Sequence, residues 1–200
     1  MHRKPFNLIL LGDPASGKGT HSRNLIRKYH FYNLDMGKEV RKPAIKALHD
    51  YARTTGKGKL TPTHVVRKIF HRVISTVPPG RGILFNGNPK MIGEARLVAK
   101  WLKQYGRRDP LVIYLHIPMH EMLRRTGARR EYIGGRLVKR DDDSAKALKN
   151  RMRYYEKQIA QVVVFFKKKY VFKKISSYGS KPEVWKKIMN EVDRYEASSR

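Results

Sequence analysis

The stretch NLILLGDPASGKGT, residues 7–20, decides the fold of this chain. It opens with a short apolar run typical of a buried strand, and residues 12–18 match the pattern of a glycine, four residues and then Gly-Lys. A helical pattern follows from Lys18, so backbone N–H groups and a helix N-terminus can both face a phosphate. A glycine-rich turn that holds a lysine by chance would lack this context. The sequence therefore predicts a phosphate-binding loop, made of Gly12, Ala15, Ser16, Gly17, Lys18, Gly19 and Thr20.

Short apolar, β-branched runs alternate with longer helical patterns along the rest of the chain, which is typical of a parallel sheet with crossover helices. The predicted strands are residues 7–11, 32–34, 82–86, 111–117 and 171–175. The predicted helices are residues 18–29, 38–53, 62–77, 91–104, 119–126, 142–169 and 182–197. We therefore expect an α/β fold, a five-stranded parallel sheet flanked by helices, in a single domain over residues 1–200.

Residues 127–140 fit neither template. They hold three glycines and five basic residues with little apolar content. This composition predicts a mobile, basic surface loop that can close over an anionic ligand.

The composition narrows the class of protein. With 200 residues, 40% of them hydrophobic, the chain is long enough for one full core. It contains no cysteine, which excludes disulfides and thiolate metal sites. The apolar runs are far shorter than a membrane span requires, so we expect a soluble, cytoplasmic protein with no membrane contact.

The charge is strongly positive: 45 Lys and Arg against 16 Asp and Glu give a formal net charge of +29. Such a field attracts polyanions, whether nucleotides, RNA or an anionic membrane surface. A general lysine enrichment with no dedicated partner explains the same number, and the sequence leaves both explanations open.

The ending Gly-Lys-Gly-Thr at residues 17–20 resembles adenylate kinases, and the resemblance extends along nearly the whole chain. It implies a three-layer sandwich of the P-loop NTPase type, with a helical monophosphate-binding insert at residues 35–64 and a short lid at residues 126–141. The implied activity is reversible transfer of the ATP γ-phosphoryl group to a nucleoside monophosphate, with Mg²⁺ bound to the ATP. A monomer is expected. The short lid resembles the branch that lacks the zinc-bearing insert, so no zinc is expected.

The acceptor side of the resemblance begins at residues 35–41, where glycine and arginine of the family segment are kept. Residues 58–62 resemble the segment that lines the same site, and residues 85–90 resemble the family's Asp-Gly-Phe-Pro-Arg. Arg41 and Lys90 fall where the family binds the acceptor phosphate, a task that suits guanidinium and ammonium groups. The implied monophosphate-binding residues are Met36, Arg41, Lys59, Thr61, Gly87, Lys90 and Glu94.

The donor side continues beyond the loop. Arg125 and Arg129 resemble the arginine pair that opens the family's lid, one stacking on the ATP base and one contacting phosphate. Arg140 and Arg151 resemble arginines aimed at the transferring phosphoryl group, and Lys181 lies in a loop that resembles the one holding the ATP base. The implied catalytic set is Lys18, Lys90, Arg129, Arg140 and Arg151, which suits a reaction that needs positioning and charge stabilisation more than covalent help.

Two departures concern the donor site. Ala15 replaces a loop glycine, which is tolerable where φ is negative and costly where it is positive. Asn86 replaces the aspartate that helps to hold magnesium through water, so metal binding should be weaker unless Asp13 or the run at residues 141–143 compensates.

Two further departures concern the acceptor base. Met36 and Glu94 replace the two side chains that recognise adenine in the family. A glutamine donates and accepts, whereas an ionised glutamate only accepts and suits the two adjacent donors of guanine. These replacements favour an acceptor other than AMP, with GMP as the first candidate.

Two alternatives to a nucleoside monophosphate kinase remain. A catalytically weakened nucleotide-binding or RNA-associated protein on the same scaffold would explain Asn86, Lys90 and the charge. A P-loop kinase for an uncharged acceptor, such as a shikimate-like alcohol or a nucleoside, would not need the paired cations Arg41 and Lys90.

Overall fold

The computed structural model describes residues 5–40, 42–47, 61–128, 131–133, 136–138 and 145–198. For residues 131–133, 136–138 and 145–156 it describes the backbone alone.

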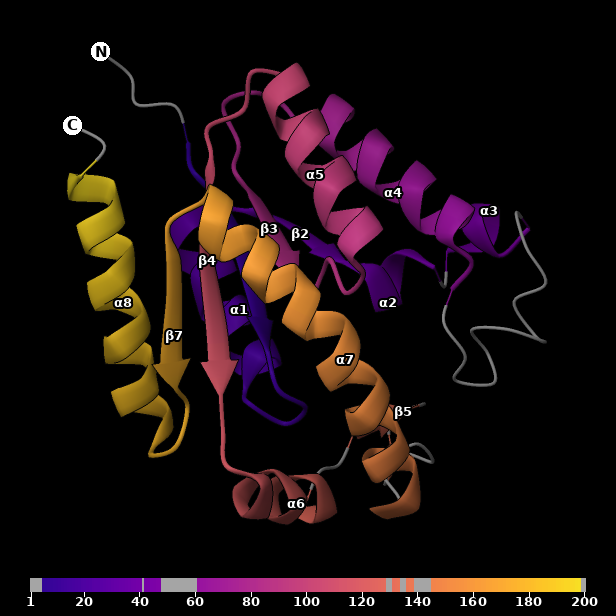
Figure 1. Cartoon of the computed structure of the whole chain (residues 1–200), viewed down its shortest axis with the longest axis vertical. Helices are drawn as coiled ribbons and strands as arrows, with labels where there is room; N and C mark the ends of the chain where they lie inside the picture. Colours follow the sequence, from indigo (N-terminus) through magenta and orange to yellow (C-terminus); the bar gives the residue numbers. More distant parts are fainter. Residues whose placement is uncertain are drawn as a thin grey trace.

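The centre of the molecule is a five-stranded parallel sheet in the order β2-β3-β1-β4-β7 (Figure 1). Its strands are β1 (Asn7–Gly12), β2 (Tyr32–Asp35), β3 (Ile83–Asn86), β4 (Pro110–His116) and β7 (Phe172–Ser176). All five predicted strands are confirmed, with each boundary within one residue of the prediction. The strand that leads into the phosphate-binding loop is therefore the central one.

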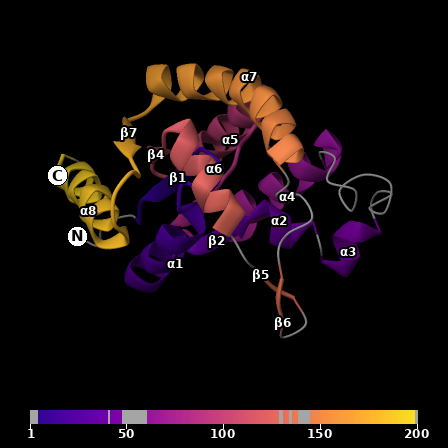
Figure 2. The ribbon, with the colours of Figure 1, turned by 90° about the horizontal axis from the view of Figure 1, so that it is seen from below.

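Helices cover both faces of this sheet and make three layers (Figure 2). The helices are α1 (Lys18–Tyr29), α2 (Met36–Glu39), α3 (Pro43–Lys46), α4 (Thr63–Thr76), α5 (Ile92–Gln104), α6 (Met119–Ala128), α7 (Ala145–Lys169) and α8 (Lys181–Ala197). The side chains of α4, α5 and α7 pack on one face of the sheet, and those of α1 and α8 pack on the other. None of the described helices is long and apolar enough to cross a membrane.

The strand β1 shows how the sequence makes these layers. Ile9 and Leu11 belong to the core beneath α4, α5 and α7, whereas Leu8 and Leu10 belong to the core beneath α1 and α8. All four side chains are 0% exposed. Successive side chains of a strand point to opposite faces, so an uninterrupted apolar run fits a strand that is buried on both sides.

The helix predicted at residues 38–53 is wrong in its extent. The structure has α2 and then α3, which begins at Pro43, while residues 48–60 lie outside the described part of the chain. Lys42 is extended, with φ −62° and ψ 137°. A proline disfavours helical geometry at the residue before it and has no N–H for a helical hydrogen bond, so the chain breaks there.

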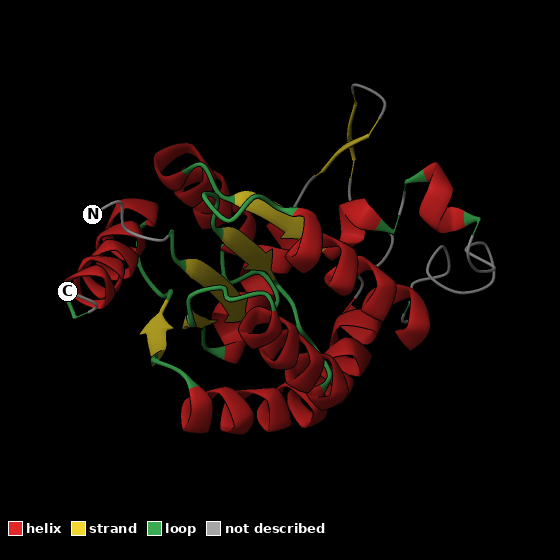
Figure 3. Cartoon of the chain, turned by 90° about the horizontal axis from the view of Figure 1, so that it is seen from above, coloured by secondary structure: helices red, strands yellow, loops and turns green. Residues whose placement is uncertain are grey.

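The prediction of a loop at residues 127–140 is wrong for residues 131–133 and 136–138, where the backbone forms a two-stranded antiparallel sheet. The strands β5 (Glu131–Ile133) and β6 (Arg136–Val138) pair antiparallel, and they project from the body of the molecule (Figures 2 and 3). The sequence carried a signal for this hairpin, because aromatic and β-branched residues flank a Gly-Gly pair at residues 134–135.

The carboxyl ends of the central strands gather the loops that matter for function. The segment after β1 is the phosphate-binding loop, the segment after β3 is the predicted acceptor loop, and β4 leads into α6 (Figure 1). Ligands of parallel α/β sheets bind at this edge.

Candidate active site

The phosphate-binding loop turns tightly between β1 and α1. A Cβ on Gly12 would lie 2.4 Å from the backbone oxygen of Leu115 on β4, so only glycine fits there. Gly17 has a φ of +84° and caps α1, which begins at Lys18. Glycine adopts this left-handed conformation without steric cost. The first N–H groups of α1 therefore face the loop, where their partial positive charge favours an anion.

The ammonium group of Lys18 lies inside this loop. Its Nζ donates to the backbone oxygens of Gly12 and Asp13, each at 2.7 Å, and lies 3.5 Å from the hydroxyl of Ser16. The side chain thus folds back over the loop that it would share with a phosphate. Gly19 is exposed at the start of α1, and the N–H of Thr20 donates to Gly17 at 3.0 Å.

The backbone at Ala15 adopts the costly one of the two expected conformations. Its φ is +57°, in the left-handed region where a side chain costs about 1 kcal/mol relative to glycine. The loop keeps its glycine-like shape despite the methyl group.

Asp13 connects the loop to the end of β4, a role that the sequence analysis missed. Its carboxylate accepts hydrogen bonds from the Tyr114 hydroxyl at 2.5 Å, from the His116 Nδ1 at 2.7 Å and from the Ile117 N–H at 2.9 Å. Both carboxylate oxygens are engaged, so the structure gives no support to Asp13 as a substitute magnesium ligand. The sequence offered a partial signal, because side chains alternate along a strand and Tyr114 and His116 therefore share one side of the strand predicted at residues 111–117.

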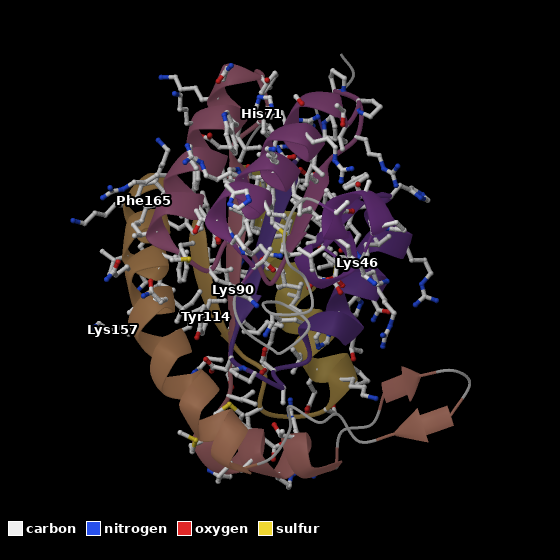
Figure 4. All side chains as sticks on the ribbon, turned by 90° about the vertical axis from the view of Figure 1, so that its right-hand side faces the viewer. Lys46, His71, Lys90, Tyr114, Lys157 and Phe165 are labelled. Carbon is white, nitrogen blue, oxygen red and sulfur yellow. The ribbon has the colours of Figure 1, made fainter. Side chains whose placement is uncertain are left out.

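The predicted acceptor loop lies against the phosphate-binding loop. The N–H of Gly87 donates to the backbone oxygen of Leu10 at 2.8 Å, and a Cβ added at Gly87 would lie 3.7 Å from Lys18 Cε. Lys90, further along this loop, is exposed, and Figure 4 shows it towards the middle of its view, with Lys46 on the outside. The structure therefore brings the donor lysine and the acceptor loop together.

Asn86, at the end of β3, is oriented by its neighbours. Its Nδ2 donates to the Ser22 hydroxyl at 3.1 Å and approaches Asn33 Oδ1 at 3.5 Å. An uncharged amide therefore stands where the family resemblance implies a carboxylate.

Glu94 caps a helix in this structure. Its Oε2 accepts from the N–H groups of Lys90 at 2.9 Å and Met91 at 3.3 Å, and the residue is 6% exposed. Burial raises the pKa of this carboxyl, against the lowering effect of the two backbone N–H groups and of Lys90. One oxygen is thus committed to α5, which leaves Oε1 as the atom that could recognise a base.

The first part of the predicted monophosphate site is built around a buried carboxylate. Glu39 is 4% exposed and accepts from Lys42 at 2.7 Å, from the Tyr32 hydroxyl at 3.4 Å and from Arg72. These contacts tie α2 to β2 and α4. Met36 begins α2 and packs against the core, and Thr61 is half-buried just before α4.

Arg125, at the base of the predicted lid, is held in place on two sides. Its Nε donates to Glu121 at 2.6 Å and its Nη2 to the Ser177 backbone oxygen at 3.0 Å. Hydrogen bonds from Arg124 and Arg125 lower the pKa of Glu121 to about 2. The planar guanidinium is therefore pre-oriented at the end of α6.

His21 is a second residue that the sequence analysis missed. Its ring is 3% exposed and stacks on Trp185 of α8 with centroids 6.3 Å apart. Burial lowers the pKa of His21, and the charges of Arg125 and Lys181 lower it further. Arg125 and Lys181, both predicted on the ATP side of the site, are thus each close enough to His21 for their charges to act on it.

The remaining predicted residues cannot be placed. Arg41, Lys59, Arg129 and Arg140 lie outside the described residues, as do the acidic residues 141–143, and of Arg151 only the backbone within α7 is described. Within the described residues, no three His, Cys, Asp or Glu side chains form a group that could hold a metal ion.

The central strand, the turn at Gly12, the ammonium of Lys18 folded over the loop and the start of α1 define a P-loop protein that binds a nucleotide phosphate at the carboxyl edge of a parallel sheet. A family model described as adenylate kinase matches residues 10–171. The chain therefore belongs to the adenylate kinase family.

Three similar proteins carry the same name. An adenylate kinase of Porphyromonas gingivalis is 29% identical over 194 residues, which cover 95% of this chain and 97% of that protein. One of Geotalea daltonii is 28% identical over 214 residues, covering 92% and 98%. One of Bacteroides thetaiotaomicron is 26% identical over 193 residues, covering 94% and 99%. The similarity extends over nearly the whole length of each pair.

Proposed function

We propose that this phosphotransferase moves the γ-phosphoryl group of magnesium-bound ATP to a nucleoside monophosphate, with AMP as the acceptor that the family indicates. The observation that carries the proposal is that the acceptor loop is held against the strand that leads into the donor loop, where the N–H of Gly87 donates to the backbone oxygen of Leu10 at 2.8 Å. Two nucleotide-binding loops held side by side can align a donor phosphate with an acceptor phosphate. Such alignment supplies much of the catalysis of phosphoryl transfer.

On the donor side, the loop N–H groups and Lys18 would bind the outer phosphates, while Arg125 and Lys181 would hold the base. Lys18 carries its charge on a flexible stem, so its ammonium can leave the carbonyl oxygens of Gly12 and Asp13 and follow the phosphoryl group as it moves. Arg129, Arg140 and Arg151 keep the roles predicted from the family resemblance.

Magnesium, when bound with ATP, would neutralise phosphate charge. The amide of Asn86 fits a contact through a metal-bound water, because its nitrogen is engaged by Ser22 and its oxygen is a hard, neutral acceptor. Because the amide of Asn86 is uncharged, the protein contributes one negative charge fewer at this position than the family resemblance implies, and the oxygens of Asp13 are already engaged by three donors. We therefore expect this chain to need a higher magnesium concentration than a variant with aspartate at position 86.

On the acceptor side, Arg41 and Lys90 would bind the monophosphate. GMP, the acceptor that the replacements at Met36 and Glu94 favour, is the alternative to AMP, because Oε1 of an ionised Glu94 would accept from guanine and not donate to adenine. The two nucleotides differ in this one recognition step, so both must be assayed.

Arg140 provides the test of the catalytic proposal. Arg140→Ala should lower kcat by a factor of about a hundred to a thousand, as the loss of a preorganised charge at the transferring group does. Lys139→Ala, which removes the neighbouring charge, is the matched control and should leave kcat within a factor of a few. Chelation of magnesium should abolish turnover in every variant. Equal activity of Arg140→Ala and the unmodified chain would exclude this role.

The competing function is nucleotide binding without efficient catalysis. It is favoured by the uncharged Asn86 together with Asp13, whose carboxylate is already engaged by three hydrogen-bond donors. It predicts ATP binding with micromolar affinity and no turnover at any magnesium concentration.

A further inference from the structure

The two helical layers of the molecule differ in charge. The helix α8 carries four Lys or Arg and four Asp or Glu, so its charges balance, and it lies beside the basic helix α1. On the opposite layer, α4 has no carboxylate, and the single carboxylate of α5 is Glu94, which is buried as a helix cap. Every exposed ionised side chain that the structure describes on α4, α5 and residues 157–169 of α7 is therefore positive.

The positive residues of this layer follow from helical spacing. Along α4, the apolar positions point into the core and every exposed charge falls on the opposite side. The same holds for α5, and α7 ends in three consecutive lysines. We call this surface the basic face; it consists of the cations Arg67, Lys68, Arg72, Arg96, Lys100, Lys103, Lys157, Lys167, Lys168 and Lys169, with the histidines His64 and His71 among them. Figure 4 shows His71 and Lys157 on the outside of this layer.

Aromatic rings lie within the basic face. His71 of α4 contacts Trp101 of α5 edge-on, with centroids 5.2 Å apart, and its Nε2 is 2.9 Å from the Tyr105 hydroxyl. Tyr105, just after α5, is 38% exposed. The hydrogen bond and the edge-on ring contacts fix the position of Tyr105 at the end of α5, with its ring inclined at 65° to that of His71.

We propose that the basic face is a docking surface for single-stranded polynucleotide. Rows of cations bind the phosphates of such a strand, and an exposed aromatic ring stacks with its bases. The exposed aromatic ring favours a polynucleotide over a simple polyanion, because a simple polyanion has charge but no bases that could stack on the ring. The face lies on the flank of the sheet, whereas the phosphate-binding loop lies at the carboxyl ends of its strands, so the two sites are separate and this proposal stands whether or not the chain transfers phosphate.

The test compares two triple variants with the same change in net charge. The face variant combines Lys68→Glu, Lys100→Glu and Lys103→Glu. The control variant combines Arg23→Glu, Lys186→Glu and Lys187→Glu, all exposed residues of the α1 and α8 layer. Binding of a labelled 20-nucleotide RNA and of the DNA of the same sequence is followed by fluorescence anisotropy at several salt concentrations. None of the six residues has been placed in the active site, so phosphotransferase activity and thermal unfolding report whether each variant is folded.

The face variant should bind both single strands at least about tenfold more weakly, and its plot of log K against log salt should be shallower by about 2, as three lost phosphate contacts require for a single strand. The control variant should stay within about threefold of the unmodified chain, because charges beyond a Debye length are screened. Equal weakening in both triple variants would overturn the proposal, as would no weakening in either. If the face variant does not fold, the triple Lys→Gln variant at the same positions is measured in its place.

Tyr105→Ala tests the stacking part. It should weaken binding of the single strands severalfold and leave binding of inorganic polyphosphate unchanged. Equal weakening for polyphosphate, or binding of the RNA duplex or of phosphatidylserine vesicles as tight as that of the single strand, would show a surface that reads charge alone and would contradict the assignment.

Discussion

The donor and acceptor sides of the site differ in what their distinctive residues do. On the donor side, Asp13 strengthens the functional geometry, because its hydrogen bonds fix the phosphate-binding loop to β4. On the acceptor side, the unusual residue Glu94 caps a helix and Met36 packs against the core. Glu94 and Met36, which replace base-recognising residues of the family pattern, thus have structural contacts of their own. The residue type at these positions therefore does not by itself reveal the base specificity.

The largest effect is expected at the donor lysine. Lys18→Ala should lower kcat by about a hundredfold to a thousandfold, because it removes the mobile cation at the transferring group. Arg23→Ala, an exposed cation on the same helix, is the control and should be neutral. Steady-state kinetics with ATP varied would measure both, and comparable turnover in the two variants would contradict the donor side of the account.

Removal of the Asp13 carboxylate should have the next largest effect. Asp13→Ala leaves three donors on β4 and in the segment after it without their acceptor, and hydrogen bonds to a charged group are each worth about 1.5–3 kcal/mol. We expect KM for ATP to rise roughly tenfold to a hundredfold by this reasoning, with a smaller change in kcat. Tyr114→Phe removes one of the three bonds and should give a smaller rise. A rise in Tyr114→Phe as large as that in Asp13→Ala would argue against a shared anchoring role.

Glu94→Gln separates base recognition from helix capping. Glutamine keeps an oxygen that can accept from the N–H groups of Lys90 and Met91, so the melting temperature should change little. If Oε1 recognises the base, the ratio of kcat/KM for AMP to that for GMP should rise about tenfold, the value of one hydrogen bond of about 1.4 kcal/mol. An unchanged ratio would assign Glu94 to the cap alone.

His21 should make the donor side sensitive to acid. Because its folded pKa lies below the ordinary value of 6.5, the unfolded chain binds the proton more readily. The histidine therefore costs no stability at pH 8, and it destabilises the fold as the pH falls below 6.5. His21→Gln removes the titration, so denaturant unfolding from pH 8 to pH 5 should show a smaller loss of stability in the variant. If the unmodified chain and the variant lose the same stability between pH 8 and pH 5, His21 is not the cause of the acid sensitivity.

Much of the fold could be predicted because it depends on local pattern. Apolar runs such as Leu8 to Leu11 mark buried strands, and the Gly-Lys-Gly-Thr ending marks the loop together with its following helix. The break before Pro43 and the hairpin around residues 134–135 also had local signals, in the proline and in the Gly-Gly pair.

The contacts of the site could not be predicted in the same way. Asp13 meets His116 across 103 positions of sequence, and His21 meets Trp185 through the packing of α1 against α8. Glu94 occupies a position where a base contact and a helix cap are both chemically reasonable, and only the placement of Oε2 shows the cap. Such choices depend on tertiary neighbours, which one sequence does not reveal.

The most direct test of phosphoryl transfer is a coupled assay of the unmodified chain with magnesium-ATP and each of AMP, GMP, CMP and UMP. The account predicts formation of ADP that requires both magnesium and a monophosphate acceptor, and that is fastest with AMP or GMP. Tight binding of ATP with no transfer to any of the four acceptors would contradict it.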